Sequence, residues 1–174
     1  MKIKEKAFMQ CSVKIVGFGD NVNTDLIHAP SKFGISRGDL SSEFVLKGED
    51  AKDSNRLILA GKNFGIGSSR FSTSIALKNS GIVAVFAVSI SRIFERNIAC
   101  AGIYPVTAGP FDMKKINAGG SGDYTLRIFA PAGEKSARAV IFCGEKLALS
   151  GIIDPFCYEI ASHKGMVNYI AGGN

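Results

Sequence analysis

The amino-acid sequence predicts a mixed α/β fold, organised as a single domain over residues 1–174. The segment between residues 56 and 106 alternates apolar runs with helical segments, which predicts parallel strands joined by right-handed crossovers. Two further strand-like runs, at 124–130 and 138–142, flank the loop APAGEKSA and predict a hairpin-like pair. With 46% hydrophobic residues, a chain of this length can bury a substantial core.

The first third of the chain predicts one strand followed by polar loops. Residues 8–18 combine alternation with apolar runs, which is typical of a strand. The next segment, GFGDNVNTDLIHAP, is rich in turn-forming residues and predicts an ordered polar loop. Residues 31–55 are polar and loosely patterned, so we expect a loop with short helical turns there.

Glycines mark off the central elements. A strand at 56–60 runs into a glycine-rich turn, and a helix is predicted at about 69–80. Gly81 ends that helix, and the continuous apolar run at 82–88 predicts a strand buried on both faces.

Similar signals divide the rest of the chain. Ser89 or Ser91 can cap the next helix, which is expected to end before Gly102. A short extended piece at 104–106 follows, and a terminal helix is predicted from about 157 to 170.

The stretch LILAGKNFGIGSSR, residues 57–70, carries the clearest signal of a binding site. Its glycines remove side chains where the backbone must turn sharply or let a ligand approach. A helix N-terminus presents unpaired N–H groups and a partial positive charge, which suit a carboxylate or a phosphate. Two hydroxyls and a guanidinium, from Ser68, Ser69 and Arg70, add donors suited to a small acid.

The same junction also has a purely structural interpretation, because serine is a good helix N-cap even where no ligand binds. The turn lacks the Lys-[Ser/Thr] ending of a P-loop, and Arg70 stands where a dinucleotide-binding fingerprint has its third glycine. A nucleotide site is therefore not favoured.

Composition argues against several classes of function. The 21 basic residues, which give a net charge of +6, are scattered and not interleaved with aromatic residues, so nucleic-acid binding is not expected. No apolar stretch reaches the ~18 residues of a membrane span, and the N-terminus lacks a signal-peptide pattern. We therefore expect a cytoplasmic protein, whose positive charge suits an acidic substrate or partner.

Metal binding by this chain is also not expected. The histidines have no obvious partners at ligand spacing, and the cysteines are widely separated without a C-x-x-C pair, which predicts structural thiols in a reducing compartment. The four cysteines are Cys11, Cys100, Cys143 and Cys157.

Three ordered stretches resemble the motifs of one family. GDNVNTDLIHAP resembles its pattern G-D-N-[IV]-[DN]-T-D-x-I, and GKNFGIGSSR resembles its G-x-N-F-G-x-G-S-S-R signature. GIVAVFAVSISRIFERNIACAGIYPV resembles its third motif, and order and spacing agree over about residues 8–110. By this resemblance the chain is identified as a member of the family of 3-isopropylmalate dehydratase small subunits, which is equivalent to the swivel domain of the aconitase superfamily.

The resemblance implies a swivelling β/β/α domain, with a mixed sheet and flanking helices. It also implies a hydro-lyase that removes and re-adds water on a hydroxy di- or tricarboxylic acid, with 3-isopropylmalate of leucine biosynthesis as the first candidate. A large partner subunit is expected to carry a [4Fe–4S] cluster, and this chain is expected to carry no cofactor. The scattered cysteines agree with that division.

The resemblance further implies roles for residues of the glycine-rich turn. Ser68 corresponds to a base that takes the substrate proton as an alkoxide, held by the helix N-terminus and by the N–H groups of the turn at Gly67. Arg70 corresponds to a residue that binds a substrate carboxylate, and Ser69 to a further hydrogen-bond donor.

Two residues outside the turn are implied in the same way. Asp25 corresponds to an aspartate at the active-site edge, with an Asx-turn in its loop as the alternative interpretation. Arg37, twelve residues later, corresponds to a second substrate arginine. Arg96, in the third motif, is interpreted as a solvated or ion-paired structural residue.

The sequence departs from the family pattern at three places. Phe71 and Ser72 stand where the family usually has Glu-His, Ile66 stands where cysteine is common, and the loop at 31–44 lacks the usual tyrosine-leucine segment. The substrate therefore stays open among 3-isopropylmalate, homoaconitate, citraconate, dimethylmalate and methylcitrate. A non-catalytic anion-binding module and an assembly subunit that has lost its chemistry remain the alternatives from other classes.

Overall fold

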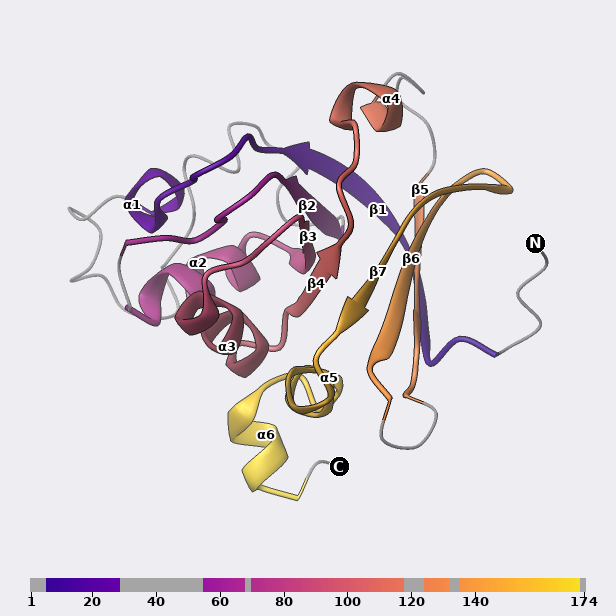
Figure 1. The fold of residues 1–174 in the computed structure, drawn as a ribbon. Coiled ribbons are helices and arrows are strands. Elements are labelled where there is room, and N and C mark those ends of the chain that lie inside the picture. The colour runs from indigo at the N-terminus through magenta and orange to yellow at the C-terminus, as the bar shows by residue number, and fades with distance from the viewer. Residues whose placement is uncertain (1–5, 29–54, 68–69, 118–123, 132–134, 173–174) are drawn as a thin grey trace.

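The structure is a computed structural model that describes residues 6–28, 55–67, 70–117, 124–131 and 135–172. The described residues form a closed barrel of seven strands in the order β1-β2-β3-β4-β7-β6-β5, with helices on its outside (Figure 1). A mixed sheet with flanking helices is therefore confirmed. Its closure into a barrel was not anticipated from the sequence.

The first half of the barrel is parallel. It consists of β1 (Met9–Gly17), β2 (Arg56–Ala60), β3 (Ile82–Ala87) and β4 (Tyr104–Ala108). Helices α2 (Ser72–Asn79) and α3 (Arg92–Cys100) form the connections after β2 and β3. The predicted alternation of strands and helices is confirmed, although α2 begins at Ser72, about three residues later than expected.

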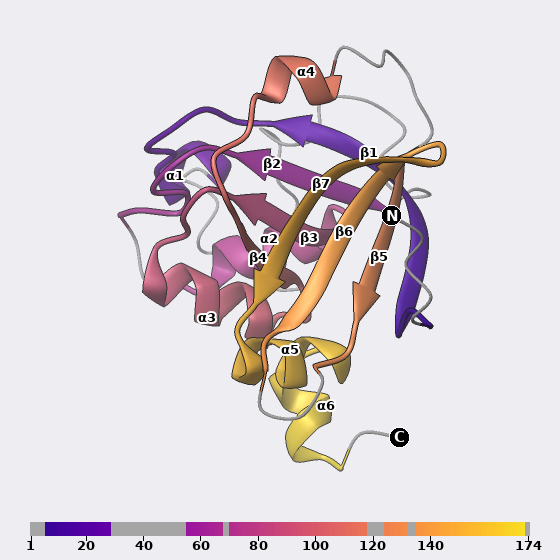
Figure 2. The ribbon, with the colours of Figure 1, turned by 45° about the vertical axis from the view of Figure 1, so that its right-hand side comes forward.

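The second half is antiparallel and closes the barrel (Figure 2). Strands β5 (Tyr124–Phe129) and β6 (Ala137–Cys143) form the predicted hairpin-like pair. Strand β7 (Lys146–Ile153) was missed, because its mixed sequence KLALSGII gives no clean alternation. It reaches β4 at Gly151, where a Cβ would lie 2.7 Å from the Thr107 carbonyl oxygen, so this close approach needs glycine.

Four further helices complete the described part of the chain. Helix α1 (Thr24–Ile27) lies in the predicted polar loop, and α4 (Met113–Asn117) follows β4. The predicted terminal helix is wrong in one respect, because the structure has two helices, α5 (Pro155–Ser162) and α6 (Met166–Ile170). Lys164 and Gly165 separate them with φ angles of 61° and 116°, which a continuous right-handed helix excludes.

Both faces of the central parallel strands β2 and β3 are buried. On β2, Leu57 and Leu59 belong to the hydrophobic cluster inside the barrel, whereas Ile58 and Ala60 belong to the cluster beneath the helices. Alternate residues of a strand point to opposite faces, so a continuous apolar run is needed to fill both clusters.

The second cluster also holds the glycine-rich turn in place. Phe64, within that turn, is fully buried, and its ring packs 5.7 Å from Phe18 and 5.8 Å from Phe94, measured between ring centroids. At Gly65, where φ is +77°, a Cβ would lie 2.0 Å from the Phe94 ring. The turn is thus anchored to the core by one aromatic side chain and fits closely against a second.

We expect Phe64→Ala to lower the free energy of unfolding by about 3–5 kcal/mol, because it removes a fully buried ring and leaves a cavity. Phe156→Ala is the matched control, since that ring is 49% exposed and should cost about 1 kcal/mol or less. Urea denaturation of both variants measures the difference. Equal losses would contradict the anchoring role of Phe64.

Candidate active site

Two loops that follow neighbouring strands are joined by backbone hydrogen bonds. The loop after β1 and the glycine-rich turn after β2 run side by side beyond the carboxyl ends of these parallel strands. Five backbone N–H groups donate to carbonyl oxygens across the two loops: Gly61 to Gly19 at 3.2 Å, Asn21 to Lys62 at 2.7 Å, Gly65 to Val22 at 2.9 Å, Ile66 to Val22 at 3.2 Å and Thr24 to Ile66 at 2.9 Å. The first two sequence motifs therefore form one structural unit.

Side chains reinforce this pairing. The Lys62 N–H donates to Asp20 Oδ1 at 2.7 Å, and the Asn63 amide donates to Asn21 Oδ1 at 2.8 Å. The Ser89 hydroxyl oxygen, two residues after the end of β3, accepts from the Asn63 N–H at 2.8 Å. Asn21 and Asn63 both have φ near +57°, a conformation that asparagine tolerates better than most residues. The loop geometry is thus fixed by polar contacts between three strand ends.

Helix α1 presents Asp25 toward the glycine-rich turn. Asn23 caps this helix by accepting from the Asp25 N–H at 2.9 Å, so the Asx-type contact in the loop is made by Asn23. The Asp25 carboxylate lies 3.6 Å from the Arg70 guanidinium, and the two side chains are 43% and 52% exposed. The structure therefore brings together an acidic and a basic residue that are 45 positions apart in the sequence.

Of the other predicted site residues, the structure describes only Gly67. Gly67 is exposed and has φ of +100°, a backbone conformation that favours glycine. Ser68, Ser69 and Arg37 lie outside the described residues. Sequence reasoning missed Asn23, although an asparagine directly before T-D-L-I is a recognisable N-cap signal.

The start of α2 differs from the expected serine-capped helix. Phe71 occupies the N-cap position and makes no side-chain cap bond. The hydroxyls of Ser72, Thr73 and Ser74 are buried and have no hydrogen-bond partner among the described residues. Phe71 and Ser72, which stand where the family usually has Glu-His, therefore connect Arg70 to the start of α2.

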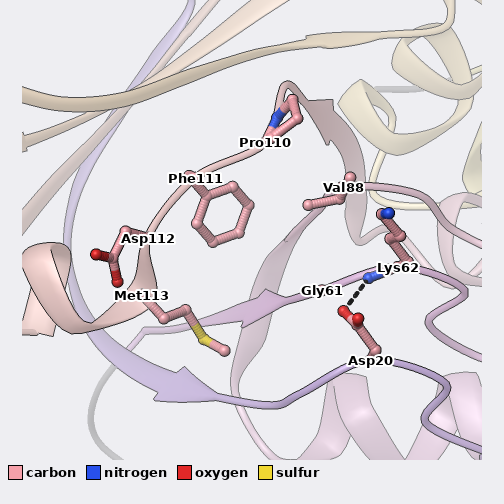
Figure 3. A pocket seen from close by; sticks show the side chains of 8 residues that line it. All are labelled: Asp20, Gly61, Lys62, Val88, Pro110, Phe111, Asp112 and Met113. Atoms are coloured by element: carbon pink, nitrogen blue, oxygen red, sulfur yellow. Dashed lines mark hydrogen bonds between the residues drawn. The ribbon is translucent and has the colours of Figure 1, made fainter.

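A pocket lies beside the paired loops, beyond the carboxyl ends of the parallel strands (Figure 3). It has a volume of about 400 Å³, and side chains from the segment after β4 form its apolar wall. The lining residues are Asp20, Gly61, Lys62, Val88, Pro110, Phe111, Asp112 and Met113. The same loop pairing thus shapes both the Asp25–Arg70 pair and one wall of this pocket.

Arg96 has the structural role that the sequence suggested. Its guanidinium lies 3.8 Å from the Asp154 carboxylate and 4.6 Å above the Phe156 ring. It therefore ties α3 to the start of α5.

The cysteines do not form a metal-binding set. They are unpaired and lie on β1, α3, β6 and α5, and no group of three or more His, Cys, Asp or Glu side chains within the described ranges is placed to hold a metal ion. Burial raises the pKa of the Cys157 thiol to about 12, which disfavours the thiolate that an iron–sulfur cluster requires. The described part of the chain does not fit such a cluster.

The described helices are too short and too polar to cross a lipid bilayer.

Residues 4–110 match the family model of the aconitase C-terminal domain, so this chain belongs to that family. The family that the three motifs indicated is thereby confirmed.

Individual relatives show which members of this family the chain resembles. The chain is 33% identical over 161 residues to the 3-isopropylmalate dehydratase small subunit of Aliarcobacter butzleri, covering 90% of this chain and 91% of that one. It is 39% identical over 108 residues to the methanogen homoaconitase small subunit of Methanothermobacter thermautotrophicus, covering 58% and 59%. The crystal structure of 3-isopropylmalate dehydratase (LeuD) from Methanocaldococcus jannaschii superposes with a TM-score of 0.70 at 30% identity, covering 94% of this chain and 95% of that chain.

Proposed function

We propose that this chain is the small subunit of a two-chain hydro-lyase that acts on a hydroxy di- or tricarboxylic acid, with 3-isopropylmalate as the first candidate. The observation that carries the proposal is the meeting of Asp25 and Arg70 at the mouth of the glycine-rich turn. The names of relatives that match along nine-tenths of both chains support the choice of substrate. The homoaconitase relative supports homoaconitate as the second candidate.

The chemistry requires groups that hold a carboxylate and stabilise negative charge. Removing a proton beside a carboxylate builds negative charge on the acid, which fixed cationic donors stabilise. Arg70 can grip a carboxylate with two parallel N–H bonds, and Asp25 holds the guanidinium in place. The Arg70 side chain is 52% exposed, so a small acid in solution can reach it.

The serines complete the proposed site. Ser68 follows Gly67 directly and is proposed as the base, and Ser69 is proposed to donate a hydrogen bond to the substrate. Arg37 is proposed as a second carboxylate-binding residue. These roles rest on the family motif and on the neighbouring position of Arg70.

A large partner subunit is proposed to supply the rest of the site. A [4Fe–4S] cluster on that subunit would act as a Lewis acid toward the departing hydroxyl. The four unpaired cysteines support a reducing compartment such as the cytoplasm.

The pair of subunits provides the direct test. We expect the chain combined with the large subunit of the same organism to hydrate or dehydrate at least one acid of a panel containing 3-isopropylmalate and homoaconitate, as followed by the ultraviolet absorbance of the unsaturated acid. The chain alone should be inactive. A cluster-loaded pair that turns over no acid in the panel would overturn the proposal in favour of an anion-binding module.

Arg70→Lys should lower kcat/KM of the active pair by roughly 30-fold to 150-fold, because an ammonium cannot reproduce the two-point grip of a guanidinium. This range corresponds to about 2–3 kcal/mol for one charge-assisted contact. Arg92→Lys, an exposed residue of α3, is the matched control and should leave kcat/KM near the wild-type value. Wild-type kcat/KM in Arg70→Lys would show that Arg70 is structural.

Ser68→Ala should lower kcat by roughly 10²-fold to 10⁴-fold if Ser68 takes the substrate proton. Ser69→Ala, which removes the same hydroxyl one position later, should cause a milder loss. A helix cap alone would cost ~1 kcal/mol of stability and leave kcat almost unchanged. Measuring kcat and Tm for both variants in the same pair separates the two roles, and equal small losses of kcat would remove Ser68 as the base.

A further inference from the structure

Asn23 contacts both Asp25, which pairs with Arg70, and Gly67 of the glycine-rich turn. We propose that Asn23 is a positioning residue that sets the distance between the glycine-rich turn and the Asp25–Arg70 pair, and so tunes how Arg70 meets a substrate carboxylate. This inference rests on the proposed function. It assigns Asn23 no contact with the substrate, because its effect passes through Asp25.

The first contact runs from Asn23 to the residue that holds Arg70. The Asn23 amide oxygen accepts from the Asp25 N–H at 2.9 Å and from the Thr24 hydroxyl at 3.4 Å. Helix α1 has only four residues, so its geometry depends on such local bonds more than on helical propagation. Loss of the cap would free the backbone that directs the Asp25 carboxylate.

The second contact runs from Asn23 to the glycine-rich turn. A Cβ placed on Gly67 would lie 2.6 Å from the Asn23 amide oxygen and 2.8 Å from its amide nitrogen. The side chain of Asn23 therefore fills the space that a side chain at position 67 would need. The Thr24 N–H bond to the Ile66 carbonyl, at 2.9 Å, fixes the two backbones beside this contact.

The two contacts together act as a spacer. Asn23 meets Gly67, and two residues further along its loop Asp25 meets Arg70 at 3.6 Å. Gly67 is therefore contacted by the cap of α1, and Arg70 is contacted by Asp25 of the helix itself. A shift of α1 would therefore move Arg70 relative to Gly67 and the preceding part of the glycine-rich turn.

The kinetic test uses the reconstituted pair and three single variants. Asn23→Ala should raise KM about fivefold or more with little change in kcat, a size comparable to the loss of one helix cap. Asn23→Asp keeps the acceptor oxygen and should restore KM to within about twofold of wild type. Asn168→Ala, on the exposed surface of α6, makes the same chemical change away from the site and should change neither constant.

A double-variant comparison tests whether Asn23 acts through Asp25. In an Asp25→Ala background, Asn23→Ala should raise KM no further, because the residue that it positions is absent. An equal increase of KM in both backgrounds, or a loss of kcat without any change of KM, would overturn the inference.

A stability comparison on the full chain tests the contact with Gly67 independently of activity. Gly67→Ala should lower Tm in the wild type through both the positive φ and the contact with Asn23. In the Asn23→Ala background the same change should lower Tm less, because only the backbone strain remains. Equal decreases of Tm in the two backgrounds would overturn the spacer role. A wild-type pair that is inactive on every acid would instead overturn the proposed function, and this inference with it.

Discussion

The hydrogen bonds that join the loop after β1 to the glycine-rich turn after β2 are the constraint on which the candidate site depends. They connect residues about 42 positions apart, and parallel pairing of the two strands brings those residues together. Each loop by itself is rich in residues that tolerate many conformations. Pairing removes that freedom, since each backbone satisfies the N–H and carbonyl groups of the other.

The core supports this pairing from beneath. Phe64 inserts from the turn into the cluster formed by α1, α3 and the outer face of the parallel strands, so the turn cannot lift away without exposing an aromatic ring. Phe94 of α3 packs against Gly65, which ties the position of the turn to a helix of the third motif. The three motifs are thus adjacent in space because their apolar residues share one cluster.

The sequence predicted the local elements of this fold better than their long-range arrangement. Helices, apolar strands and glycine turns have periodic or punctuating signals, so the parallel segments and the β5–β6 pair were recognised. Strand β7 has no clear alternation, and its pairing with β4 depends on Gly151, whose need for close approach is visible only in three dimensions. The break before α6 falls at Lys164 and Gly165, and the glycine is a helix-stop signal that the prediction of one continuous helix overlooked.

The same distinction holds for the site. Motif resemblance indicated Asp25 and Arg70 separately, whereas their contact at 3.6 Å and the part of Asn23 in directing it follow from loop pairing. Asn23 carries a local N-cap signal, but its contact with Gly67 joins segments 44 positions apart and has no sequence signature.

The exposure of Asp25 and Arg70 bears on why such a chain would work with a partner. An exposed ion pair contributes little stability in water, because solvent screens it and each side chain loses conformational freedom. Covering the pair with a second protein surface would lower the local dielectric and strengthen both the pair and any carboxylate held by Arg70. Loop pairing already fixes the backbone around Asp25. Binding a partner or substrate there therefore loses little further conformational entropy of this loop. On the proposed function, the chain presents a preorganised but solvent-exposed half-site, and the electrostatic strength of that half-site develops only when the large subunit closes over it.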